Sequence, residues 1–136
     1  MDKSVSIQGL LNGRLNTLAT AQSYTVKWEG QVSDPASGSY LRSWLMLATP
    51  RAAALGTSAS NLARGTYQVD VVTDLGGWGA AYTIADKIAD HFKRSTRLTA
   101  TDVELTCESV LTGPAMRQDG KYVLPVSITF YAYVQV

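Results

Sequence analysis

The sequence predicts an α+β fold, with a mainly antiparallel β-sheet packed against two α-helices in a single domain that spans residues 1–136. Three observations support this class. Apolar residues return at helical spacing in two separate segments, and several other segments alternate between apolar and polar residues. The order is helix, strands, helix, strands, without the strict alternation that a parallel sheet requires. A chain of 136 residues has enough material for one sizeable core.

The first helix is predicted over about 4–21, because apolar side chains recur there at steps of three and four. The recurring residues are Ile7, Leu11, Leu15 and Leu18. Gly9 and Gly13 each weaken such a helix by roughly 1 kcal/mol relative to alanine, so packing has to stabilise it. The two glycines could form a close-contact face or be unremarkable.

Strands and loops are predicted to follow. Thr25–Val32 alternates as a strand does, and Ser33–Ser39 is a loop rich in turn-forming residues. The apolar run Tyr40–Thr49 predicts a central strand that Pro50 ends. Arg51–Ala63 is predicted to be a second flexible stretch, with a possible helical turn at RAAAL.

The middle of the chain predicts a strand, a turn and the second helix. Arg64–Asp74 alternates, and LGGWG at 75–79 breaks the strand. We expect its glycines to adopt positive φ and to let Trp78 pack against the sheet. An anion site at this helix start is disfavoured, since the lysine and hydroxyl of a phosphate-binding loop are missing. The apolar positions of the helix are Ala81, Ile84, Ala85, Ile88, Ala89 and Phe92.

Further strands are predicted to complete the sheet. Val103–Leu111 alternates, AMRQ at 115–118 could be a short strand, and 121–136 is the clearest strand of all. In this last strand Tyr131 and Tyr133 lie opposite the stripe of valine, isoleucine and phenylalanine. They could pack against the first helix or form an interface, where tyrosine is enriched.

Charge and residue usage disfavour several functions. With 12 basic and 11 acidic residues the formal net charge is +1, too balanced for a general nucleic-acid binder. The single cysteine, Cys107, allows no internal disulfide and favours a reducing compartment. We expect no signal peptide, no membrane span and a cytoplasmic location unless the chain leaves inside a larger particle. His91, the only histidine, is expected on an exposed helix face, so we expect no catalytic site, metal or cofactor.

The order of several motifs resembles the bacteriophage tail-terminator-like proteins, a family similar to the lambda tail terminator. The motifs are YLR at 40–42, LG at 55–56, RGTYQVDV at 64–71, GGWG at 76–79, AYTIADKIADHF at 81–92 and VSITFYAYV at 126–134. They are spread over most of the chain. The chain departs from the family at Asp74, where members often carry proline, and at Lys121 and Tyr122, where tryptophan is often found.

The resemblance implies a structural virion protein. Such a subunit forms a ring, typically a hexamer, that caps the tail tube, stops its polymerisation and offers the head-tail joining surface. Its partners would be copies of itself, the tail-tube protein and a head-completion or connector protein. DNA would pass through the lumen without specific binding, and no membrane would be involved. The location would be the virion tail or neck, after assembly in the host cytoplasm.

Contacts between subunits or with the tube are expected at the two loops, 33–39 and 51–61, and at five side chains. These are Arg42, Arg51, Arg64, Tyr131 and Tyr133. The three arginines could form ion pairs across a ring or be solvated charges. The alternatives are a tail-tube or head-tail connector subunit, which is also structural, and a small hydrolase or ligand-binding module, which would be a monomer with a polar pocket.

Overall fold

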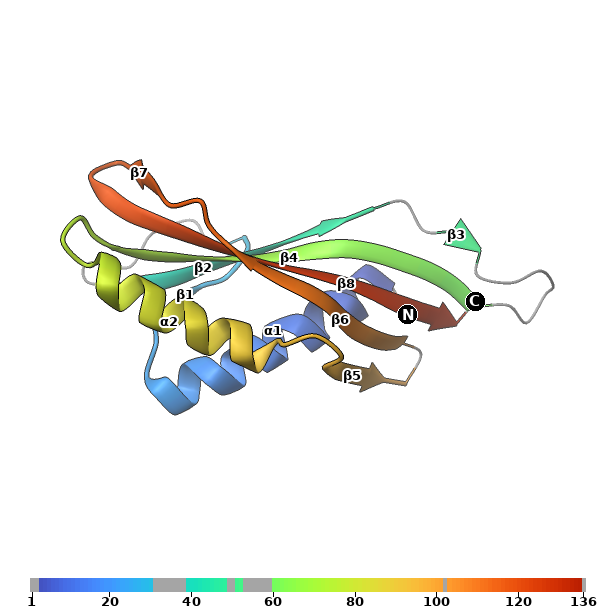
Figure 1. Ribbon diagram of the computed structural model, residues 1–136. Helices are drawn as coiled ribbons and strands as arrows, with labels where there is room; N and C mark the ends of the chain where they lie inside the picture. Colours follow the sequence, from blue (N-terminus) through green and yellow to red (C-terminus); the bar gives the residue numbers. More distant parts are fainter. Residues whose placement is uncertain (1–2, 31–38, 49–50, 53–59, 102, 136) are drawn as a thin grey trace.

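A computed structural model of the chain describes residues 3–30, 39–48, 51–52, 60–101 and 103–135 (Figure 1). The described residues form two helices and one curved, mostly antiparallel sheet, so the predicted α+β class is confirmed. In chain order the elements are α1 (Lys3–Gln22), β1 (Val26–Lys27), β2 (Tyr40–Leu47), β3 (Arg51–Ala52), β4 (Ser60–Asp74), α2 (Trp78–His91), β5 (Arg97–Ala100), β6 (Val103–Thr112), β7 (Met116–Gln118) and β8 (Lys121–Gln135).

Two long strands, β4 and β8, form the centre of the sheet. Each has 15 residues, and they pair antiparallel over their whole length. At about 3.4 Å a residue, this ladder is roughly 50 Å long. β2 and β3 lie one after the other along the free side of β4, and β6 and β7 do the same along β8. The short strands β1 and β5 form the two borders, and β1 pairs with β2 in parallel.

Both helices lie on one side of the sheet (Figure 1). The predicted helical positions Ile7, Leu11, Leu15 and Leu18 are buried in α1. In α2 the buried residues are Ala81, Ala85 and Ile88, and Phe92 is buried just after the helix ends. These side chains form one apolar cluster with the alternate residues of β4 and β8 that face them. Burial of this apolar area is the main contribution to the stability of the fold.

A reciprocal pair of hydrogen bonds joins the two helices. The Arg14 guanidinium of α1 donates to the His91 carbonyl oxygen at the end of α2, at 3.0 Å from Nε and 2.8 Å from Nη2. The His91 Nε2 in turn donates to the Arg14 carbonyl oxygen at 2.8 Å. His91 is therefore half-buried, which corrects the expectation of an exposed histidine.

Several predicted strands and loops need correction. The first strand covers only Val26 and Lys27, and β2 lies next to the border of the sheet rather than at its centre. Arg51 and Ala52 form a strand instead of a helical turn, and 60–63 belongs to β4 instead of a flexible stretch. β5 was not predicted. Residues 33–38 and 53–59 of the two predicted loops lie outside the described residues.

The turn between β4 and α2 also differs from the prediction. None of Gly76, Gly77 and Gly79 has a positive φ, and the φ of Gly77 is −94°. Space favours glycine at 77, because a Cβ there would lie 3.1 Å from both Cβ and Oγ1 of Thr73. Trp78 does not pack on the sheet, since 64% of its surface is exposed.

The second face of the sheet is covered by neither helix (Figure 1). A small apolar cluster of Tyr40, Val72 and Val123 is buried there near the end of the sheet that carries β7. The rest of this face is mostly polar in the described part of the chain. We call it the open sheet face, with its central residues being Arg64, Glu108, Tyr131 and Tyr133.

Candidate assembly surfaces

Three of the five side chains predicted from the sequence meet on the open sheet face. Arg64 pairs across the ladder with Tyr131, and its guanidinium carbon lies 5.9 Å from the centre of the Tyr131 ring. The Tyr131 and Tyr133 rings are 6.0 Å apart and edge-to-face. Alternation along β8 places both tyrosines on the face opposite to the helices, where Tyr133 is 45% exposed and Tyr131 is partly buried.

The arginines of the open sheet face already have acidic partners within the chain. Arg64 Nη1 is 3.5 Å from Glu108 Oε2, and Arg97 Nη1 is 3.5 Å from Glu104 Oε1. All four side chains are about half-exposed. Exposed pairs of this length contribute little to folding, because water screens them and long side chains lose freedom. They can exchange partners at small cost when another surface arrives.

Arg42 belongs to a separate and better buried network. Its Nη2 lies 2.9 Å from Asp70 Oδ2 and donates to Gln118 Oε1 at 3.0 Å. Asp70, whose side chain is only 4% exposed, also accepts a hydrogen bond from Gln68 at 3.0 Å. These bonds join β2, β4 and β7. Arg42 therefore has a structural role inside the subunit, whatever it contacts outside.

The three predicted arginines do not form one cluster. Arg42 aligns with Asp70 of β4, six residues along the strand from Arg64. The backbone of Arg51 pairs with Leu62, while its side chain is outside what the structure describes. A ring contact through all three would have to extend over much of the sheet.

A second surface, which the sequence did not predict, lies at the end of the molecule where β4 turns into α2. Large apolar side chains are exposed there: Leu75 46%, Trp78 64%, Tyr82 43% and Met116 51%. We call these four residues, together with Arg117, the apolar tip. A pocket of about 370 Å³ lies between α2 and the β7–β8 hairpin, and Leu75, Trp78, Arg117 and Tyr122 are among its lining residues.

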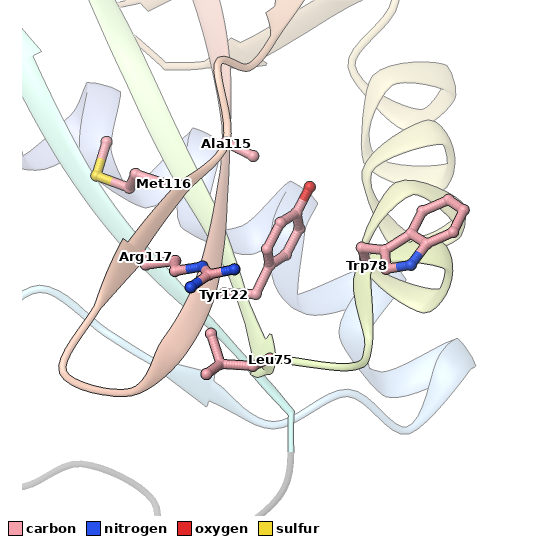
Figure 2. A pocket seen from close by; sticks show the side chains of 6 residues that line it. All are labelled: Leu75, Trp78, Ala115, Met116, Arg117 and Tyr122. Atoms are coloured by element: carbon pink, nitrogen blue, oxygen red, sulfur yellow. The ribbon is translucent and has the colours of Figure 1, made fainter.

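Figure 2 shows Leu75, Trp78, Met116 and Arg117 of the apolar tip together with Tyr122 of the pocket. Leu75, Arg117 and Tyr122 lie around the space beside the hairpin, while the Trp78 ring points away from the hairpin. No side-chain hydrogen bond or ion pair of Trp78 or Arg117 is found within the described part of the chain. Exposed tryptophan, tyrosine, methionine and arginine are the residues that protein interfaces favour. The turn glycines indicated a loop here, but no pattern in the sequence shows which loop side chains are left uncovered.

A third surface is a shallow hollow between α1 and β2. It has a volume of about 230 Å³ and is lined by Val5, Gln8, Glu29, Leu45 and Leu47. Val5 is 61% exposed and Leu47 39%. The Glu29 Oε1 accepts a hydrogen bond from the Leu45 backbone N–H at 2.7 Å, which places its carboxylate at the side of the hollow. We call this surface the acidic hollow.

The titratable groups of the core are inert rather than activated. Burial raises the pKa of the Cys107 thiol to about 11, which leaves it protonated at neutral pH. Burial lowers the pKa of His91, although its hydrogen bond to the Arg14 carbonyl oxygen acts in the opposite direction. In the described ranges no three His, Cys, Asp or Glu side chains are placed to hold a metal ion. Neither α1 nor α2 is long and apolar enough to cross a membrane.

Comparison with known proteins identifies one protein family and similar solved structures. The family model described as phage tail terminator protein matches residues 6–130. One solved structure, known by a sequence identifier alone, has a TM-score of 0.76 and 25% identity over 100% of this chain and 97% of its own. A chain in the virion of a native gene transfer agent particle has a TM-score of 0.56 and 18% identity, with 95% and 94% covered. No curated protein sequence matches significantly.

Proposed function

This chain belongs to the phage tail terminator protein family, and we propose that it forms a ring, of six copies, that caps the tail tube and stops its polymerisation. The chain is a structural protein of the phage tail, and the match over residues 6–130 is the observation that carries the proposal. The fold shared with a chain of a virion particle supports an assembled role. The face of the ring away from the tube would join the head-completion or connector protein.

The shape of the subunit is suited to such a ring. Its exposed apolar residues lie at separate places on the molecule, as a head-to-tail interface requires. If the rotation between neighbours closes, six copies leave no unused lateral surface. A near-neutral subunit also suits a lumen that DNA crosses without being held, because each phosphate contact would add to binding.

We assign the open sheet face to contacts with a neighbour or with the tube. Arg64, Tyr131 and Tyr133 carry this assignment, because aromatic residues beside exchangeable ion pairs are typical of interfaces. Arg42 and Arg51 are secondary candidates. A variant with both Arg51→Ala and Arg64→Ala should form fewer rings in electron micrographs, and normal rings with infectious particles would remove these arginines from the interface.

The test of the function is the mass of the purified chain with and without tail tubes, followed by imaging of tube ends. A terminator gives a discrete oligomer and density at one end of each tube. Long tubes formed by this chain alone would identify a tube subunit instead. A monomer that never binds tube ends would contradict every assembly role.

This assay does not test an enzymatic role, which the pocket at the apolar tip disfavours. Such a role would require a polar pocket that brings a nucleophile and a base together, whereas the pocket at the apolar tip is lined mainly by apolar side chains, with Arg117 and Tyr122 as its polar ones. The particle location follows from the family: the chain is a virion-associated tail protein, and we propose that it assembles in the host cytoplasm.

A further inference from the structure

We propose that the apolar tip of one subunit binds the acidic hollow of the next, with Trp78 as the inserted side chain and Arg117 facing Glu29. This inference rests on the proposed ring, because it names the interface that would close it. The partner is thus a second copy of this chain. Nothing in the family match or in the structural relatives assigns these two surfaces.

The two surfaces are complementary in shape. Trp78 is the most exposed aromatic residue among the exposed large apolar side chains, and its ring points away from its own subunit's hairpin (Figure 2). The acidic hollow is concave, with Val5 and Leu47 exposed on it. A projecting indole and an apolar hollow can remove each other from water, which is the main source of affinity at such contacts.

The two surfaces are also complementary in charge and hydrogen bonding. The described residues provide no acidic partner for Arg117, whereas Arg42, Arg64 and Arg97 each have one. The indole N–H of Trp78 is a second donor for which the described residues supply no acceptor. The Glu29 carboxylate can take further donors besides the Leu45 N–H, since it offers about four acceptor positions.

Their separation fits a head-to-tail interface. Leu47 of the acidic hollow pairs with Gly65 of β4, and Leu75 of the apolar tip follows Asp74, the last residue of β4. Nine residues of β4 therefore lie between the two surfaces. At about 3.4 Å a residue, the separation is roughly 30 Å. Two different surfaces this far apart cannot bind each other within one subunit. The apolar tip of each copy must therefore bind one neighbour, and its acidic hollow must bind another.

The first experiment uses substitutions in the full chain, read by sedimentation and by electron microscopy of tube ends. Trp78→Ala should weaken assembly about tenfold or more, as loss of a central aromatic residue does. Lys93→Ala is the control, because Lys93 is exposed and belongs to none of the three surfaces. Assembly of Trp78→Ala that is as strong as the control would overturn the proposal. Circular dichroism and thermal unfolding confirm that each variant is folded.

The second experiment exchanges the charges. Arg117→Glu alone and Glu29→Arg alone should each weaken assembly, and the variant with both changes should recover it. Arg94→Glu serves as the control for a charge reversal elsewhere, since Arg94 is exposed. Glu29→Gln separates the charge from the hydrogen bond to Leu45. If the combined variant is as weak as the two single variants, Arg117 does not face Glu29.

The third experiment mixes two damaged subunits. A copy with Trp78→Ala keeps an intact hollow, and a copy with Leu47→Asp keeps an intact tip. In an equimolar mixture, assembly should therefore end at dimers that contain one copy of each variant. A tip-to-tip contact predicts instead that Leu47→Asp alone still assembles. Normal rings from both variants would overturn this interface while leaving the proposed function intact. A wild-type chain that never assembles, even on tube ends, would overturn the function itself.

Discussion

Gly65 shows how a single residue limits the approach of three strands. It pairs with Leu47 of β2 on one side and with Phe130 of β8 on the other. A Cβ at this position would lie 2.6 Å from the Met46 carbonyl oxygen and 3.0 Å from the Phe130 ring. The missing side chain is therefore what lets the Phe130 ring and the β2 backbone come so close to β4. Gly9 in α1 has no such neighbour, because a Cβ there meets nothing within 4 Å.

The two glycines should respond oppositely to alanine. Gly65→Ala should lower the free energy of unfolding by about 1–3 kcal/mol, because either the carbonyl or the ring must move. Gly9→Ala should raise it by about 0.5–1 kcal/mol, because alanine loses less backbone entropy in a helix. Urea unfolding followed by circular dichroism measures both. Equal effects of the two changes would show that the Gly65 contact is not tight.

At the scale of elements, the end of α2 is stabilised by a side chain from α1. The last carbonyl groups of a helix have no partner within the helix, and a cation is favourable beside them. Arg14 provides both a donor pair and a positive charge to the carbonyl oxygen of His91. The two helices are therefore positioned relative to each other by polar bonds as well as by apolar packing.

Removal of the Arg14 side chain tests how much it contributes to the stability of the fold. Arg14→Ala should lower the free energy of unfolding by about 1–2 kcal/mol, since a half-buried carbonyl then lacks its donor. Arg94→Ala is the control, because Arg94 is an exposed arginine just beyond the same helix. Chemical denaturation of the two variants gives the comparison. A loss no larger than that of the control would mean that water replaces the guanidinium fully.

Elements with a long apolar repeat were predictable, and short ones were not. The alternation of β8 and the helical spacing of α1 are properties of many consecutive residues, so the sequence carries them directly. β1, β3 and β5 have two to four residues each, and they are strands because a neighbouring strand holds them. Likewise, alternation predicted which residues share a face with Tyr131. It could not predict that Trp78 stays uncovered, because that depends on where the β7–β8 hairpin ends.

For the molecule as a whole, Cys107 reports on unfolding. It lies in β6 with no exposed surface, inside the single apolar cluster that joins sheet and helices. Both its burial and its pKa of about 11 suppress reaction with thiol reagents. A reagent can reach it only when the cluster opens, and this cluster includes both helices and the central strands.

We therefore expect Cys107 to be unreactive toward a disulfide reagent at pH 8 in native buffer and to react fully in denaturant. The slow rate at which Cys107 is labelled in buffer should follow the rate or the equilibrium constant of global unfolding, measured independently. Gly65→Ala should speed up the labelling in proportion to its loss of stability. Rapid labelling of the native wild-type chain would show that β6 opens separately from the rest of the fold.

The pairing of β2 with β4 has a mechanical consequence. The apolar tip follows the last residue of β4, and the acidic hollow is connected to the same strand through the pairing of Leu47 with Gly65. Tension between neighbouring copies would therefore pass from β2 into β4 along their ladder of eight residue pairs. A load in that direction shears many hydrogen bonds at once instead of opening them one after another. Such a subunit resists stretching along its sheet.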